Sequence, residues 1–249
     1  MIELDKFSAT FRDFSDDYCV IGGGAMLEIA KNYSLQPRAT KDIDIIVFVK
    51  ASTPSFIRKL ALFAQEAAYR ECSHSENFCS YRFSHPKDKT YPDQIELFCF
   101  DPVLGNELQH HLVHSTLGQG VSFSAILLDK DYYDFAQQHV LKSEISYLSE
   151  EAMIPLKAKA YLANKELWEE HADGASSANY RKHGRDLIRL SLLLNNAHTL
   201  ALPRKIYQDL DHALLRLREE GFDCSEIAGV SSFALIESAI RNHYTEAKV

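Results

Sequence analysis

The sequence predicts an α+β fold, in which a small mixed β-sheet flanked by helices is followed by a C-terminal helical domain. Two observations support this prediction. Before about residue 147, short apolar segments rich in β-branched residues alternate with amphipathic segments, and from Ser149 onward only helical patterns follow. We therefore expect one domain at 1–147 and a helical domain at 148–249.

The first predicted elements are a helix, a strand and a second helix. Leu4 and the phenylalanines at 7, 11 and 14 recur at helical spacing, which indicates an amphipathic helix over 3–14. The run YCVIGGGAM then reads as a buried strand over 18–21, a tight glycine turn at 22–24, and a return to helix formers.

The next elements alternate in the same way. DIDIIVFV at 42–49 is β-branched and almost wholly apolar, as expected of a strand. Thr53 followed by Pro54 is typical of a helix start. The further predicted elements are a helix from Thr53 to about 71, strands near 77–84 and 94–100, a short helix near 103–113, and strands or loops around 121–128.

The C-terminal helices have recognisable ends. Ser149 followed by two glutamates suits a helix N-terminus, Pro203 suits the start of another helix, and Gly221 suits its end. The predicted helices run from Ser149 to about Trp168, from Tyr180 to Leu194, from Pro203 to Gly221, and over about 231–243.

The composition is that of an ordinary globular protein, with 249 residues, 46% hydrophobic and 25% charged. The net charge of −8 argues against a protein whose whole surface grips nucleic acid. No apolar run approaches the roughly 20 residues that span a bilayer, and the N-terminus does not resemble a signal peptide. We expect a cytoplasmic protein without membrane association, whose five scattered cysteines are reduced thiols.

Asp42 and Asp44 are the strongest candidates for chemistry. They lie two residues apart at the start of a predicted strand, so both carboxylates point to the same face. Like charges held this close repel each other unless a cation lies between them. Oxygen ligands favour Mg²⁺, so the pair predicts a magnesium site open to solvent at the end of a strand.

Gly22, Gly23 and Gly24 supply the second part of this site. Without side chains, their backbone N–H groups can approach a phosphate closely, and the helix that follows adds its positive N-terminal end. A glycine turn into a helix, followed by Asp-x-Asp on the next strand, suits a nucleoside triphosphate bound with Mg²⁺.

Glu96 is the candidate third acid. It is a single carboxylate between Ile95 and Leu97 in an apolar strand, and it faces the metals if that strand neighbours the Asp42–Asp44 strand. There it could bind a second metal ion and accept a proton from an attacking hydroxyl. Asp93 and Asp101, at the ends of the same strand, are its competitors.

The run GGGAMLEIAKNYSLQPRATKDIDIIV resembles the first motif of the nucleotidyltransferases of the DNA polymerase beta superfamily, closest to the bacterial AbiEii-type toxin branch. The branch pattern is GG-x-A followed by R-x-T-x-D-h-D, where h is apolar. Arg38 and Thr40 occupy the Arg and Thr positions of that pattern. IPLKAKAYL and YRKHGRDLIRL resemble the helical motifs of the branch and provide Lys157, Lys182 and Asp186.

The resemblance implies a nucleotidyltransferase fold in 1–147 and an enzyme that moves a nucleoside monophosphate from a triphosphate such as ATP to a hydroxyl. It implies two Mg²⁺ ions held by Asp42, Asp44 and Glu96. Arg38, Thr40, Lys157, Lys182 and Asp186 would join the glycines in binding the nucleotide. The acceptor would be an RNA 3′ end such as that of tRNA, a protein hydroxyl or a small molecule; base preference and oligomeric state are not readable.

Other interpretations remain open. Many superfamily members have Gly-Ser where this chain has Gly22-Gly23, and Asp is usual where this chain has Glu96. A catalytically weakened nucleotide-binding or protein-interaction component of a toxin–antitoxin system is therefore the alternative. A glycosyltransferase would use Asp-x-Asp but would not explain the upstream glycines. Zinc binding at Cys72, His74, Cys79 and His85 matches no standard ligand spacing, and the histidines 110, 111 and 114 fit a surface cluster on one predicted helix better than a metal site.

Overall fold

The computed structural model consists of two compact units, Met1–Ser149 and Glu150–Val249. The predicted boundary, between residues 147 and 148, lies close to this division. The structure describes residues 4–33, 40–48, 53–75, 80–98, 130–172, 174–195, 197–224, 227, 230 and 232–248. Over these ranges, no helix combines the length and apolar character needed to cross a membrane.

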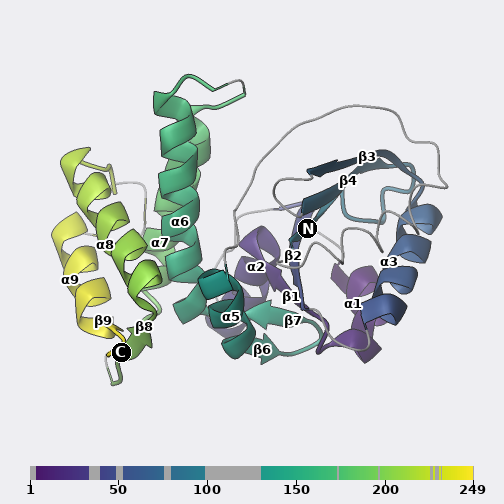
Figure 1. The fold of residues 1–249 in the computed structure, drawn as a ribbon, viewed down its shortest axis with the longest axis horizontal. Helices are drawn as coiled ribbons and strands as arrows, with labels where there is room; N and C mark the ends of the chain where they lie inside the picture. The colour runs from purple at the N-terminus through teal and green to yellow at the C-terminus, as the bar shows by residue number, and fades with distance from the viewer. Residues whose placement is uncertain are drawn as a thin grey trace. The chain divides into compact units, whose positions relative to one another are not determined.

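The first unit contains helices and strands in alternation (Figure 1). In chain order its elements are α1 (Leu4–Phe11), the 3₁₀ helix η1 (Arg12–Phe14), β1 (Tyr18–Ile21), α2 (Gly22–Tyr33), β2 (Asp42–Val47), α3 (Thr53–Ala67), β3 (Tyr69–Ser75), β4 (Ser80–Pro86), β5 (Gln94–Phe98), α5 (Lys130–Gln138), β6 (Val140–Lys142) and β7 (Ser146–Leu148).

The strands described in this unit form one mixed sheet in the order β3-β4-β5-β2-β1-β7-β6. β2 is central, pairing antiparallel with β1 and parallel with β5. β1 also pairs parallel with β7, and the outer pairs on both sides are antiparallel. The predicted mixed sheet flanked by helices is therefore confirmed.

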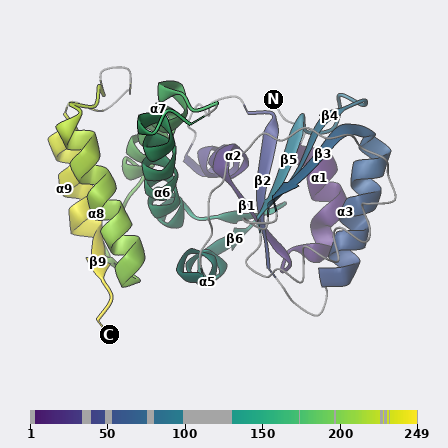
Figure 2. The ribbon, with the colours of Figure 1, turned by 45° about the horizontal axis from the view of Figure 1, so that its top comes forward.

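The two faces of the sheet differ in character. Figure 2 shows α1 and α3 against one face and α2 against the other. On the α1–α3 side, Tyr18 stacks on Phe56 with ring centroids 5.9 Å apart, and Phe7 and Phe11 pack edge-on around them. Rings buried in this way provide much of the apolar core of this unit.

The second unit is built mainly of helices, with one short pair of strands. Its elements are α6 (Glu150–Glu169), α7 (Ser177–Ser191), β8 (Leu200–Leu202), α8 (Arg204–Glu219), α9 (Phe233–His243) and β9 (Tyr244–Glu246). β8 and β9 pair in parallel, and Figures 1 and 2 both show α6 beside α7 and α8 beside α9. Gly221 has φ +58° just after α8, as expected of a helix C-cap.

Several predicted elements need correction. The helix predicted over 53–71 ends at Ala67, because Ala68 turns the chain at φ +48° and β3 begins at Tyr69. β3 lies at the edge of the sheet, where a polar sequence such as YRECSHS is tolerated and no apolar alternation marks the strand. The glycines at 22–24 form the first turn of α2 and are not a loop before it.

Short elements were missed entirely. The sequence did not predict α5 or the three-residue strands β6, β7, β8 and β9. These strands are too short to show an alternation of apolar and polar residues. The helix predicted near 103–113 and the segment 121–128 lie outside the described residues. Cys19 and Cys224 are free, buried thiols, as predicted for the cysteines.

Candidate active site

Asp42 and Asp44 lie at the start of β2, on the face opposite the aromatic core. Ile43 and Ile45 are fully buried, whereas Asp42 is exposed and Asp44 is half-buried. This alternation sends both carboxylates to the same side of the strand, as the period of two predicts.

Glu96 lies beside Asp44 on the neighbouring strand. β5 pairs with β2 in parallel register, and Asp44 stands directly opposite Glu96. Neighbouring strands are about 4.8 Å apart, and paired residues point to the same face. The structure therefore places the third acid next to the second, on a sheet face where carboxylate oxygens suit Mg²⁺.

Gly22 lies directly against Asp44. Its φ of +62° is left-handed, and a Cβ added there would lie 2.0 Å from Asp44 Oδ2. Only glycine fits this position without a shift, because any side chain would occupy the place of the carboxylate. The start of α2, which carries roughly half a positive elementary charge, is thus brought to the acidic edge of β2.

Thr40 and Gly23 extend this close packing by one residue. A Cβ at Gly23 would lie 2.7 Å from Thr40 Oγ1, and the same hydroxyl accepts a hydrogen bond of 3.3 Å from the backbone N–H of Asp42. Thr40 therefore braces the chain that leads into β2 against the first turn of α2. At Gly24, an added Cβ would meet Val20 Cγ1 at 2.7 Å, so this glycine allows α2 to pack closely on β1.

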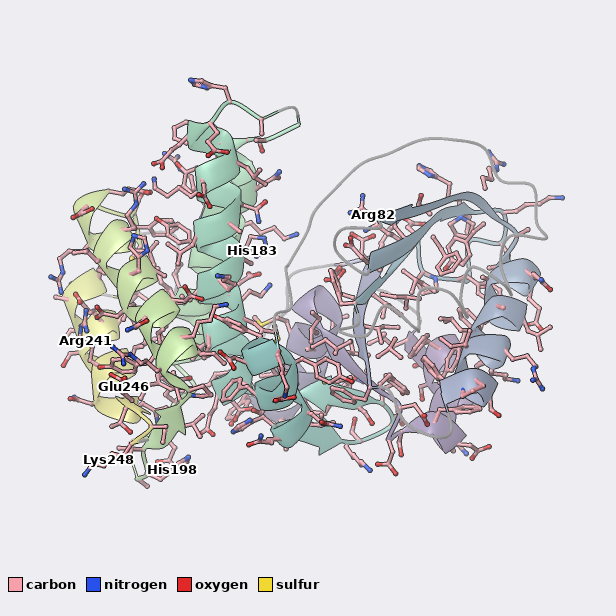
Figure 3. The ribbon with its side chains drawn as sticks, in the orientation of Figure 1. Arg82, His183, His198, Arg241, Glu246 and Lys248 are labelled. Carbon is pink, nitrogen blue, oxygen red and sulfur yellow. The ribbon has the colours of Figure 1, made fainter. Side chains whose placement is uncertain are left out.

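Arg82 is a residue of this face that the sequence did not single out. It stands opposite Glu96 on β4, and its Nη2 lies 2.9 Å from Glu96 Oε1 (Figure 3). Glu96 is 5% exposed, so it is a buried carboxylate held by a charged hydrogen bond. The sequence signal for this pair is a basic residue at the position on the neighbouring strand that matches Glu96. That position can be identified only once the register of the two strands is known.

Asp93 and Asp101 were the alternative candidates for the third acid, and the structure describes only the first of them. Asp93 lies just before the first residue of β5 and is half-buried, with Oδ2 3.4 Å from Lys41 Nζ and Oδ1 3.7 Å from Lys89 Nζ. Its carboxylate is engaged by two lysines outside the Asp44–Glu96 row. Asp101 and Arg38 lie outside the described residues.

Lys157, Lys182 and Asp186 belong to the second unit, and their role in nucleotide binding stays a prediction. Lys157 Nζ lies 2.9 Å from Asp186 Oδ2, and both side chains are buried. The Asp186 carboxylate therefore forms a buried ion pair with a lysine of α6. Lys182 lies on the same helix as Asp186, α7, and is exposed.

Three lysines of α6 are engaged by acidic residues inside the second unit. On α6, Lys157 pairs with Asp186, Lys159 Nζ lies 3.0 Å from Asp209 Oδ2, and Lys165 forms ion pairs with Glu169 and Glu220. On α7, Arg181 and Lys182 are exposed.

No protein-family model matches this sequence, and no curated protein matches it. Among solved structures, the chain is similar to an antigenic nucleotidyltransferase-like protein from Paracoccidioides brasiliensis. The two chains share 14% sequence identity, and the similarity covers 98% of this chain and 92% of that chain with a TM-score of 0.48. A similarity of this strength establishes neither a common fold nor a common function.

Proposed function

We propose that this chain is a magnesium-dependent nucleotidyltransferase, which moves a nucleoside monophosphate from a nucleoside triphosphate to an acceptor hydroxyl and releases pyrophosphate. The contact between Asp44 and Gly22 is the observation on which the proposal depends. It brings oxygen ligands for a cation and the N-terminus of a helix, which favours phosphate, to the same place. The resemblance to the AbiEii-type branch rests on the same residues.

Each residue has a role that follows from its position. Asp42 and Asp44 would bind two Mg²⁺ ions from one face of β2, and Glu96 would complete the second metal site and accept the proton of the acceptor hydroxyl. Backbone N–H groups of the glycine turn would hold the triphosphate, and Thr40 would keep that turn in place. Bound Mg²⁺ would supply neutralisation of the charge that develops on the transferred phosphoryl group.

The direct test is the double substitution Asp42→Asn with Asp44→Asn. We expect magnesium-dependent transfer of label from an α-labelled triphosphate to fall by at least about 100-fold, since even residues that only orient metal ligands cost about 10–100-fold when changed. Transfer is measured with purified protein, Mg²⁺, each of the four triphosphates and cell extract, and the RNA, protein and small-molecule fractions are counted separately.

Asp93→Asn is the matched control. It removes a carboxylate from the same edge of the sheet, but one that faces Lys41 and Lys89. Its transfer rate should stay within about twofold of wild type, as expected of a half-buried group whose carboxylate is engaged outside the site. If the double variant binds Mg²⁺–nucleotide and transfers label as well as wild type does, the site is assigned to the wrong residues.

The Arg82–Glu96 pair favours a second candidate function, a nucleotide-binding component with weakened catalysis, such as one member of a toxin–antitoxin pair. The Arg82 guanidinium offsets the negative charge of the Glu96 carboxylate, and Glu96 needs that charge to bind a metal ion or accept a proton. In an enzyme, the same hydrogen bond would instead orient the carboxylate toward the metals.

Arg82→Gln separates the two candidates. If Arg82 orients Glu96 for catalysis, we expect transfer to fall by about 10–100-fold, with little change in the binding of Mg²⁺–nucleotide. If Arg82 instead holds Glu96 away from the metals, its removal tightens Mg²⁺ binding and does not lower transfer. Isothermal titration with Mg²⁺ and a non-hydrolysable triphosphate, beside the transfer assay, gives both quantities.

A further inference from the structure

Three side chains from distant parts of the second unit converge at one point. Glu151 lies in the first turn of α6, His198 lies just before β8, and His243 is the last residue of α9. His198 Nε2 is 2.7 Å and His243 Nε2 is 3.3 Å from Glu151 Oε1. One potential ligand atom from each of the three lies within 4.8 Å of the other two.

The environment of His243 shows that this cluster is more than a surface ion pair. The residue is only 1% exposed, and its Nδ1 lies 3.2 Å from the carbonyl oxygen of Asn195. A carbonyl accepts only, so Nδ1 carries a proton and donates it. In the neutral ring Nε2 then carries a lone pair, and this buried atom has no hydrogen-bond partner.

The lone pair of His243 therefore faces a carboxylate oxygen, which is also an acceptor. The buried Nε2 atom and the half-buried carboxylate oxygen disfavour each other unless a proton or a metal ion lies between them. The arrangement matches that of a metal-ligating histidine, which presents one ring nitrogen to the ion while the other donates to a backbone carbonyl.

We propose that Glu151, His198 and His243 form a binding site for a divalent transition-metal ion, with Zn²⁺ as the ion of choice. Two imidazole nitrogens favour Zn²⁺ over Mg²⁺ or Ca²⁺, and the carboxylate leaves the set with a net negative charge. Bond lengths of about 2.0–2.1 Å in a tetrahedral site put ligand atoms about 3.3 Å apart, and the two distances to Glu151 Oε1, 2.7 and 3.3 Å, are near this value.

The surroundings fit such a site. The Tyr244 hydroxyl donates to the Glu151 carbonyl oxygen at 2.7 Å, so the backbone of this ligand is tied to the residue after His243. His198 has a side chain that is 54% exposed and lies at the end of the unit that carries Glu246 and Lys248 (Figure 3). Solvent therefore reaches the site, and a fourth ligand can be water.

The bound ion would cross-link α6, the segment before β8 and the end of α9. Metal binding would stabilise the folded unit, because the three ligands are close together only in the folded chain. This site uses none of the residues of the proposed active site, and the inference does not depend on the proposed transferase activity.

The test is titration of the full chain with Zn²⁺ after treatment with a chelator. We expect one saturable Zn²⁺ site per chain, whose affinity falls by at least about 100-fold in His198→Ala and in Glu151→Gln. Residues that only orient a metal ligand change the metal affinity by about 10–100-fold when they are removed, and the loss of a ligand itself should cost more. At 100-fold excess over Kd, Zn²⁺ should raise the midpoint of thermal unfolding by at least about 5 °C. The fluorescence emission of Trp168 is used to monitor this unfolding.

His212→Ala is the control, because it removes an exposed histidine of α8 and should bind Zn²⁺ as wild type does. His198 is half-exposed, so its variant is expected to fold, and circular dichroism checks this. A Co²⁺ absorption spectrum typical of tetrahedral nitrogen and oxygen ligands, lost in His198→Ala, supports the site. Equal Zn²⁺ binding by wild type, His198→Ala and Glu151→Gln overturns the proposal, as does the absence of saturable binding.

Discussion

Asp186→Ala is expected to lower the free energy of unfolding of the second unit by about 3–5 kcal/mol. Lys157 and Asp186 are 5% and 3% exposed, and their charged atoms lie 2.9 Å apart. Without the carboxylate, the ammonium of Lys157 stays buried and loses the partner that offsets its desolvation. The loss therefore reflects an uncompensated charge far more than the strength of the original pair.

Two further variants test this reasoning. Lys157→Met with Asp186→Leu removes both charges, and its stability should lie near that of wild type or above it. Asp209→Ala breaks the pair with Lys159, whose side chains are 24% and 21% exposed, and should cost at most about 1 kcal/mol. Urea unfolding followed by Trp168 measures all three, since this tryptophan lies on α6 with its ring centroid 5.4 Å from that of Tyr180 on α7. A loss below about 1 kcal/mol for Asp186→Ala would show that water reaches Lys157.

The local features of the candidate site were predictable from the sequence. Asp42 and Asp44 are two residues apart on a strand, so the pleat alone puts them on one face. The glycines at 22–24 had to adjoin a strand end because the apolar run before them stops there. The same period failed for β3 and for the three-residue strands, where either no alternation or too few residues provide a signal.

The long-range pairs were not predictable, because nothing in the local sequence marks them. In the local sequence, Lys182 is a basic residue that an i,i+4 spacing places on the same helical face as Asp186. The structure pairs Asp186 with Lys157 of another helix, and nothing in the local sequence marks this buried pair. Arg82 with Glu96, and Glu151 with the two histidines, are likewise brought together only by the strand register and helix packing.

Gly22→Ala is expected to lower the free energy of unfolding of the first unit by about 2–5 kcal/mol. Two costs add: about 1–2 kcal/mol for an alanine held at φ +62°, and about 1–3 kcal/mol for a Cβ placed 2.0 Å from Asp44 Oδ2. The single tryptophan lies in the second unit, so hydrogen exchange of the amides in β1, α2 and β2 provides the measurement. These amides should lose protection to the extent that the unit is destabilised.

Gly221→Ala separates the two costs, because Gly221 has φ +58° and, among the residues that the structure describes, no atom comes within 4 Å of an added Cβ. It should cost only about 1–2 kcal/mol, the backbone share of the loss. Gly22→Ala combined with Asp44→Ala should cost less than the summed losses of the two single variants, since the Asp44 Oδ2 and Cγ atoms, 2.0 and 3.0 Å from the added Cβ, are then gone. If Gly22→Ala costs no more than Gly221→Ala, the Asp44 carboxylate can move aside freely. In that case it is not fixed at the start of α2, and the place where a cation and a phosphate would meet loses its physical basis.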